Sequence, residues 1–244
     1  MITGSHNEAK LKSRDNCGIC GTPLVYQTDP VSMTCVFCKQ KRTTNIYCPE
    51  GHYICDSCHE REALDILRQV LNTSTSASPN EILEAVMAHP SVPMHGPEHH
   101  AMVPAVIIGA ARNAGYSIPL EAVEQAISRG AKIPGGWCGF YGACGAAIGV
   151  GIAVSIITKA TPVTGKQRSL AIEATSYTLN KLTDGHPRCC KRESRKALEA
   201  AVEFLRNKMD MTLDKGQEIK CNYSHRNQEC AKENCDYYSD KLNP

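Results

Sequence analysis

The pattern of apolar and polar positions divides the chain near residue 60. From Arg61 onward, apolar residues recur three and four positions apart, which is the spacing of one face of an α-helix. Over residues 16–60 this periodicity is nearly absent. A stretch so poor in hydrophobic residues cannot bury a core, so it needs another source of folding free energy. We therefore predict a small module over residues 16–60 and a mainly α-helical domain over residues 61–244.

The helical domain is predicted to contain a series of separate helices. One begins at Arg61, and a second follows the polar stretch 72–80, with Ser78 as its N-cap and Pro79 in its first turn. Further helices are predicted over about 101–114, 119–129, 143–158, 166–182 and 194–208. Pro104 is tolerable only near the first turn of its helix. No alternating strand pattern occurs in this part of the chain, and the segment after Leu213 reads as irregular.

One segment resembles a membrane helix. Residues 140–157 carry no charge, and Gly145 and Gly149 form the small-xxx-small pair of membrane helix dimers. The segment is short for a bilayer and rich in Gly and Ala rather than Leu. We therefore predict a buried helix of a protein with no membrane association, in which the glycines allow close helix packing.

Composition narrows the class of partner. The net charge is +2, the pI is about 7.9 and aromatic residues make up 5%, so no nucleic-acid partner is expected. The cations Lys39, Lys41 and Arg42 are interpreted as a solvated turn. The first residues lack a secretory leader, so the 14 cysteines are expected to be reduced thiols in a cytoplasm, most naturally that of an anaerobe.

Half of the cysteines fall between residues 17 and 58 in pairs spaced like metal ligands. The spacing C-x2-C-x14-C-x2-C is typical of zinc sites, and the following C-x3-H-x2-C-x2-C supplies a second tetrahedral set. The predicted ligands are Cys17, Cys20, Cys35, Cys38, Cys48, His52, Cys55 and Cys58. His59 is an alternative to His52, and the pairs can combine sequentially or in an interleaved way. We predict a zinc-ribbon or treble-clef-like module with two zinc ions in closed, structural sites.

The helical domain carries a second, less regular set of thiols and imidazoles. Cysteines near helix starts or among cations have stabilised thiolates and make better nucleophiles or ligands. The candidate catalytic residues are His95, His99, His100, Cys138, Cys144, Cys189 and Cys190. The candidate cofactor ligands are Cys221, Cys230 and Cys235. They predict an iron–sulfur cluster or further zinc, with a metal-free reactive thiol or simply buried cysteines as alternatives.

Two details of this set can be predicted. Adjacent cysteines rarely join each other in a disulfide, so Cys189 and Cys190 are expected to face different partners. The sequence GACGAAIGVG has no preceding strand and no suitably placed acidic residue, so it does not predict a dinucleotide-binding loop.

Several long motifs occur together: CPEGHYICDSCH, MHGPEHH, GGWCGFYGACGAAIGVG, PRCCKRES and the closing NQEC. Over about residues 16–238 they resemble an uncharacterised cysteine-rich family of anaerobic bacteria and archaea. Members of that family look like standalone proteins or fusions to radical-SAM or methyltransferase domains. The resemblance therefore implies an anaerobic setting and a radical-SAM or methyltransferase partner, but no reaction.

Three functions remain open at this point. The first is a metalloenzyme, or enzyme component, of redox, sulfur or one-carbon chemistry. The second is an adaptor that binds protein or nucleic acid through the zinc module, and the third is a carrier of metal or clusters. An enzyme should bring the HGPEHH histidines together with Cys138 and Cys144 at a pocket, whereas an adaptor should leave them apart. The oligomeric state is not predicted.

Overall fold

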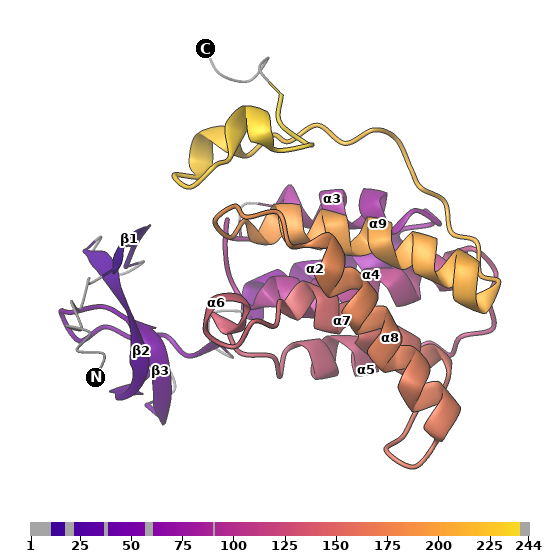
Figure 1. Cartoon of the computed structure of the whole chain (residues 1–244), viewed down its shortest axis with the longest axis horizontal. Helices are drawn as coiled ribbons and strands as arrows, with labels where there is room; N and C mark the ends of the chain where they lie inside the picture. Colours follow the sequence, from indigo (N-terminus) through magenta and orange to yellow (C-terminus); the bar gives the residue numbers. More distant parts are fainter. Residues whose placement is uncertain (1–10, 18–21, 37–38, 57–60, 90, 240–244) are drawn as a thin grey trace, which may run out of the picture. The chain divides into compact units, whose positions relative to one another are not determined.

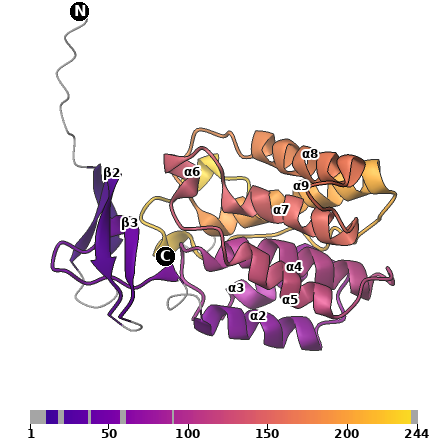
Figure 2. The same ribbon diagram turned by 90° about the horizontal axis from the view of Figure 1, so that it is seen from below.

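The computed structural model describes residues 11–17, 22–36, 39–56, 61–89 and 91–239. The chain forms two compact units, Met1–Cys58 and His59–Pro244, each of which is described by itself. The N-terminal unit contains strands and the second unit contains helices (Figures 1 and 2).

The N-terminal unit is built on a three-stranded antiparallel sheet in the order β1-β2-β3. The strands are β1 (Leu11–Asn16), β2 (Pro23–Thr34) and β3 (Lys41–Tyr47). Burial is described for residues 17, 22–36 and 39–56, and within these positions the buried residues are Cys17, Cys35, Cys48 and Cys55. The interior of the described part of this unit thus consists of thiols rather than aliphatic side chains. This composition fits a module that is held together by metal.

The second unit is mainly α-helical. Its helices are α2 (Arg61–Thr73), α3 (Pro79–Met87), α4 (Glu98–Asn113), α5 (Glu121–Gly130), α6 (Trp137–Phe140), α7 (Gly145–Ile157), α8 (Gly165–Lys181) and α9 (Cys190–Met209). Two short 3-10 helices, η1 (Ser224–Arg226) and η2 (Lys232–Asn234), lie in the segment 210–239, which we call the C-terminal segment. None of the helices in the described part of the chain is long and apolar enough to cross a membrane.

Helix α4 is the centre of the helical unit. Nearly all its side chains from Glu98 to Ala111 are buried, and it contacts α2, α3, α5, α7 and α9 (Figure 2). Helix α7 packs between α4 and α8 at glycines. A Cβ atom at Gly149 would lie 2.8 Å from Pro104 Cδ, and one at Gly151 would lie 2.0 Å from Thr175 Oγ1. The prediction that these glycines allow close helix packing is confirmed.

Two helices begin earlier than predicted, and both differences move site residues. Helix α4 starts at Glu98 rather than near residue 101, so Glu98, His99 and His100 form its first turn instead of a preceding loop. Pro104 lies in the second turn, not the first. Helix α9 starts at Cys190 rather than near residue 194. The first turns of both helices consist mainly of charged and polar residues, so apolar spacing does not indicate where these helices begin.

Candidate functional site

Three cysteines of the N-terminal unit begin turns that are closed by backbone hydrogen bonds. The backbone N–H of Cys17 donates to the Thr22 carbonyl at 2.8 Å, and that of Cys35 donates to the Gln40 carbonyl at 3.0 Å. Cys48 begins a similar turn, in which its N–H donates to the His52 carbonyl and Gly51 has a positive φ of 82°. All three cysteines are buried.

The ligand atoms of Cys17, Cys48 and His52 all lie within 4.8 Å of one another, so this cluster could hold a metal ion. It is the one such group of three found among the described residues. Cys35 is associated instead with Cys55, whose backbone N–H donates to Cys35 Sγ at 3.4 Å. The described ligands are therefore grouped in the interleaved way, the first pair with the third and the second with the fourth. Cys20, Cys38, Cys58 and His59 lie outside the described residues.

A second candidate site is a cavity of about 660 Å³ inside the helical unit, which we call the helical cavity. It is lined by His99 and His100 of α4, by Cys138 of α6, by Cys144 at the N-cap of α7 and by Cys190 at the start of α9. These five candidates come from segments that are far apart in the sequence. Four of them, His99, His100, Cys138 and Cys144, belong to the combination that separates the enzyme hypothesis from the adaptor hypothesis, whereas its remaining member, His95, does not line this cavity.

The first turn of α4 fixes both histidine rings. His99 is 1% exposed, and its Nδ1 lies 3.2 Å from the Gly96 carbonyl oxygen and 3.2 Å from Glu98 Oε1. With its proton on Nδ1, the ring donates to the Gly96 carbonyl oxygen and keeps the lone pair on Nε2. His99 Nε2 is buried without a hydrogen-bond partner among the described residues. A nitrogen in that state is suited to a metal or to a bound ligand.

His100 is held in a similar way from another direction. Its Nδ1 lies 2.9 Å from the carbonyl oxygen of Ile133, which acts as the acceptor. A Cβ atom at Gly145 would lie 2.3 Å from the ring atoms of His100. The ring therefore occupies the space that the absent side chain of Gly145 leaves at the start of α7. This close approach explains a glycine at this position better than helix packing does.

Burial makes the cavity thiols weak acids in the absence of metal. It raises the pKa of Cys144 to about 11, although hydrogen bonds from the backbone of Ala146 and Ala147 lower it. Burial also raises the pKa of Cys190, against a backbone hydrogen bond from Gly96. Cys138 is exposed. At neutral pH the Cys144 and Cys190 thiols are protonated, and a bound cation would convert them to thiolates.

The remaining predicted residues lie elsewhere. Cys189 lines a second, small cavity of about 20 Å³ together with Cys221, Cys230 and Cys235 of the C-terminal segment. His95 Nε2 lies 3.2 Å from Asn227 Oδ1, and Asn227 lines the same small cavity. Cys189 and Cys190 thus face different partners, as expected. His95 and Cys189 do not line the helical cavity.

A comparison with protein families matches the helical unit. The model of a family of unknown function, DUF5714, matches residues 67–238. The chain belongs to this family. The match begins after the N-terminal unit, so the DUF5714 region contains both the helical cavity and the small cavity. No curated protein and no solved structure matches the chain.

Within the DUF5714 region, the structure adds residues that were not among the candidate site residues. Asp184, His186, Arg188 and Glu193 also line the helical cavity. Burial raises the pKa of Glu193, although Arg192 lowers it through its charge and a hydrogen bond of 2.6 Å. The PRCCKRES motif contains two of the four residues, so attention to the charged neighbours of Cys189 and Cys190 would have found them.

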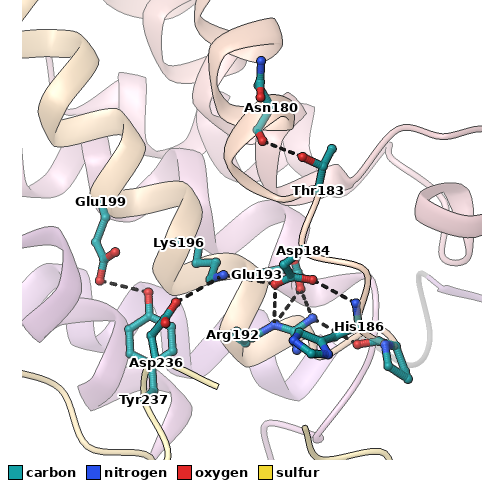
Figure 3. Close-up of polar contacts among 11 residues, drawn as sticks. Asn180, Thr183, Asp184, His186, Arg192, Glu193, Lys196, Glu199, Asp236 and Tyr237 are labelled. Atoms are coloured by element: carbon teal, nitrogen blue, oxygen red, sulfur yellow. Dashed lines mark hydrogen bonds and ion pairs between the residues drawn. The ribbon is translucent and has the colours of Figure 1, made fainter. Parts of the chain in front are cut away.

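A polar network joins the loop before α9 to that helix and to the C-terminal segment (Figure 3). Asp184 Oδ2 accepts from Lys196 Nζ at 3.0 Å and lies 3.5 Å from Arg192 Nε, while Asp184 Oδ1 accepts from the His186 backbone N–H at 3.1 Å. On the other side, Tyr237 donates to Glu199 Oε1 at 2.9 Å. The contacts of Asp184 hold its loop, which lines the helical cavity, against α9.

Proposed function

We propose that this chain is a metal-dependent enzyme, or a component of one, and that the helical cavity is its active site. The observation that carries the proposal is the meeting of His99, His100, Cys138, Cys144 and Cys190 around one cavity of about 660 Å³. A volume of this order suits a small-molecule substrate. We assign the chemistry to redox, sulfur or one-carbon reactions of anaerobic metabolism, in a cytoplasm.

The donor set favours a transition metal. Imidazole and thiolate ligands select zinc, iron or copper over magnesium and calcium. The contact of His99 Nδ1 with the Gly96 carbonyl and the Glu98 carboxylate is the outer contact that a metal-binding histidine commonly makes. His99 Nε2, buried without a partner among the described residues, is the first proposed ligand.

The raised thiol pKa values argue against a metal-free nucleophile. A reactive cysteine needs a lowered pKa, whereas burial raises the pKa of Cys144 to about 11. We therefore assign Cys144 and Cys190 as metal ligands rather than nucleophiles. A metal bound here would supply Lewis-acid or redox chemistry.

Other residues of the cavity have roles that do not depend on the identity of the metal. Burial raises the pKa of Glu193, against the charge and hydrogen bond of Arg192, and a raised pKa suits a carboxyl group that transfers protons. Arg188 adds a guanidinium to the lining, which favours a substrate that carries a carboxylate or phosphate. Cys138, which is exposed, lies where a substrate or a partner's cofactor would enter.

The N-terminal unit is proposed to be a zinc module of the zinc-ribbon or treble-clef type with two ions. The grouping of Cys17 with Cys48 and His52 supports an interleaved arrangement. Four ligands close each site and leave no position for substrate, so these ions would be structural. A radical-SAM or methyltransferase enzyme is the proposed partner of the whole chain.

The test is metal analysis of the full chain after anaerobic purification. The variants are His99→Ala and Cys144→Ser, with His89→Ala as the control because His89 is exposed. We expect the first two variants to lose about one equivalent of metal and the control to lose none. Equal metal content in all the proteins would overturn the metal-dependent proposal.

A second measurement separates an active site from a closed site. After cobalt substitution, added azide should change the visible spectrum of the wild type, because an active site keeps a position open for an outside ligand. The change should disappear in His99→Ala. A cobalt spectrum of the wild type that is unchanged by azide would contradict the assignment as an enzyme.

A further inference from the structure

The small cavity gathers four thiols that the chain carries far apart. Cys189 is the N-cap residue of α9, and Cys221, Cys230 and Cys235 belong to the C-terminal segment. All four are free thiols, and the cavity that they share has a volume of about 20 Å³. This space holds little more than one atom-sized sphere, which takes about 10–15 Å³.

Backbone donors approach each of the sulfurs. Cys221 Sγ accepts from the N–H of Tyr223 at 3.4 Å, and Cys230 Sγ accepts from the N–H of Lys232 at 3.4 Å. Cys235 has the same relation to Tyr237, two residues further on, and Cys189 has a backbone hydrogen bond from Arg192. Amide donors at sulfur stabilise the thiolate form, and they are a regular feature of metal–thiolate centres.

The charges around the cavity suit a centre with excess negative charge. Four thiolates around a divalent ion carry a net charge of about −2. Arg192 and Arg195 both line the cavity, and the guanidinium of Arg195 also lies over the rings of Tyr223 and Tyr237 at 5.6 and 5.3 Å. Cys189 lies at the N-terminus of α9, where the positive end of the helix dipole favours a thiolate.

Regular secondary structure does little to fix the path of the C-terminal segment, which is held by individual contacts such as that of Tyr237 with Glu199. Over residues 210–239 its regular structure is limited to η1 and η2, of three residues each. Yet Cys221, Tyr223 and Tyr237 are buried against the helical unit. A metal cross-link would stabilise such an arrangement in a segment without long helices or strands.

We propose that Cys189, Cys221, Cys230 and Cys235 are the four ligands of a closed metal centre that fastens the C-terminal segment to α9. The centre is separate from the helical cavity and does not rest on the function proposed for it. No three of these sulfurs lie within 4.8 Å of one another. Binding therefore either draws the sulfurs together around zinc or widens the cavity to admit an iron–sulfur cluster, and thiolate coordination is common to both.

The first test needs no variant. The anaerobically purified wild-type chain is treated with iodoacetamide before and after a chelator, and the modified cysteines are mapped by mass spectrometry. We expect Cys230 and Cys235, which are partly exposed, to resist modification until metal is removed. Full modification of both before chelation would overturn the proposal.

The second test uses Cys230→Ser and Cys235→Ser, with metal content and limited proteolysis as readouts. Each variant should lose the same metal, either about one zinc or the iron of one cluster, and become sensitive to cleavage between residues 210 and 239. A visible thiolate-to-iron absorption band separates the cluster from zinc. Unchanged metal content in both variants would exclude the centre.

The controls are His99→Ala and Cys144→Ser, which alter the helical cavity. They should leave Cys230 and Cys235 protected from iodoacetamide. A failure of the proposed function therefore appears in the His99 and Cys144 variants, and a failure of the four-thiolate centre appears in the Cys230 and Cys235 variants.

Discussion

Cys189 and Cys190 are adjacent in the chain, yet their side chains line different cavities. Cys189 is the extended N-cap of α9 with φ −141° and ψ 98°, whereas Cys190 is the first residue within the helix. The change of backbone conformation between them directs one thiol toward the C-terminal segment and the other toward α4 and α7. The start of α9 is therefore shared by two sites.

The contact between Gly145 and His100 predicts that adding one methyl group at Gly145 destabilises the fold. Gly145→Ala places a Cβ atom 2.3 Å from the imidazole ring, so the ring must move. We expect a loss of about 1–3 kcal/mol in the free energy of unfolding, measured by urea denaturation, together with loss of metal from the helical cavity.

Gly165→Ala is the matched control for this substitution. Gly165 is also the first residue of its helix, and a Cβ atom there would meet no atom within 4 Å. The control should be neutral or stabilising by up to about 1 kcal/mol. Equal effects of the two substitutions would contradict the role of Gly145.

Asp184 predicts a pH-dependent contribution to stability. Burial raises the pKa of Asp184. The hydrogen bonds from Lys196 and the His186 backbone and the charge of Arg192 lower it by more, so the net shift is downward. A carboxylate with a lowered pKa stabilises the fold above its unfolded pKa, and the contribution is lost as the pH falls through the folded pKa.

Asp184→Asn should therefore cost about 1 kcal/mol at pH 7, and the difference from wild type should shrink below about pH 4. Denaturation at several pH values measures this. Asp65→Asn, at a side chain that is 67% exposed beside Arg68, should have a smaller effect. A pH-independent difference for Asp184→Asn would show that its charge does not matter.

The buried ion pair of Arg195 and Glu84 predicts a large loss of stability when Glu84 is replaced by glutamine. Arg195 Nε and Nη2 donate to the two carboxylate oxygens at 2.6 and 2.9 Å, and the Arg195 side chain is 1% exposed. Glu84→Gln leaves a buried guanidinium without its counter-charge, and we expect a loss of about 3 kcal/mol in the free energy of unfolding.

The control is Glu173→Gln, because Glu173 pairs with Lys208 at 2.7 Å and both side chains are about half exposed. Glu173→Gln should lower the free energy of unfolding by less than about 0.5 kcal/mol. Urea denaturation measures the loss for both substitutions. Similar losses for the two substitutions would mean that burial of Arg195 is not what makes its ion pair important.

The grouping of the N-terminal ligands predicts the outcome of two double substitutions. If Cys17 and Cys48 bind one ion and Cys35 binds another, Cys17→Ser/Cys48→Ser should lose about one zinc and Cys17→Ser/Cys35→Ser about two. Sequential pairing reverses the two results. Zinc content measured by mass spectrometry decides between them.

The sequence predicted most of the helices because their apolar faces repeat regularly, and it located each candidate thiol. It missed the start of α4, where Glu98 and His99 are buried although polar, because burial of polar residues has no signal in an apolar pattern. It listed Cys189 and Cys190 together as candidate catalytic residues, although it expected the two thiols to face different partners. Which cavity each thiol faces depends on the path of the C-terminal segment, and that path has no periodicity from which it could be predicted.

The separation of the two sites at Cys189 and Cys190 is tested most directly by thiol mapping of Cys189→Ser and Cys190→Ser after anaerobic purification. In Cys189→Ser, we expect Cys221, Cys230 and Cys235 to become reactive toward iodoacetamide while Cys144 stays protected. In Cys190→Ser, we expect Cys144 to become reactive while the three C-terminal cysteines stay protected. The same set of cysteines exposed by both substitutions, or no change in either, would contradict two separate metal sites.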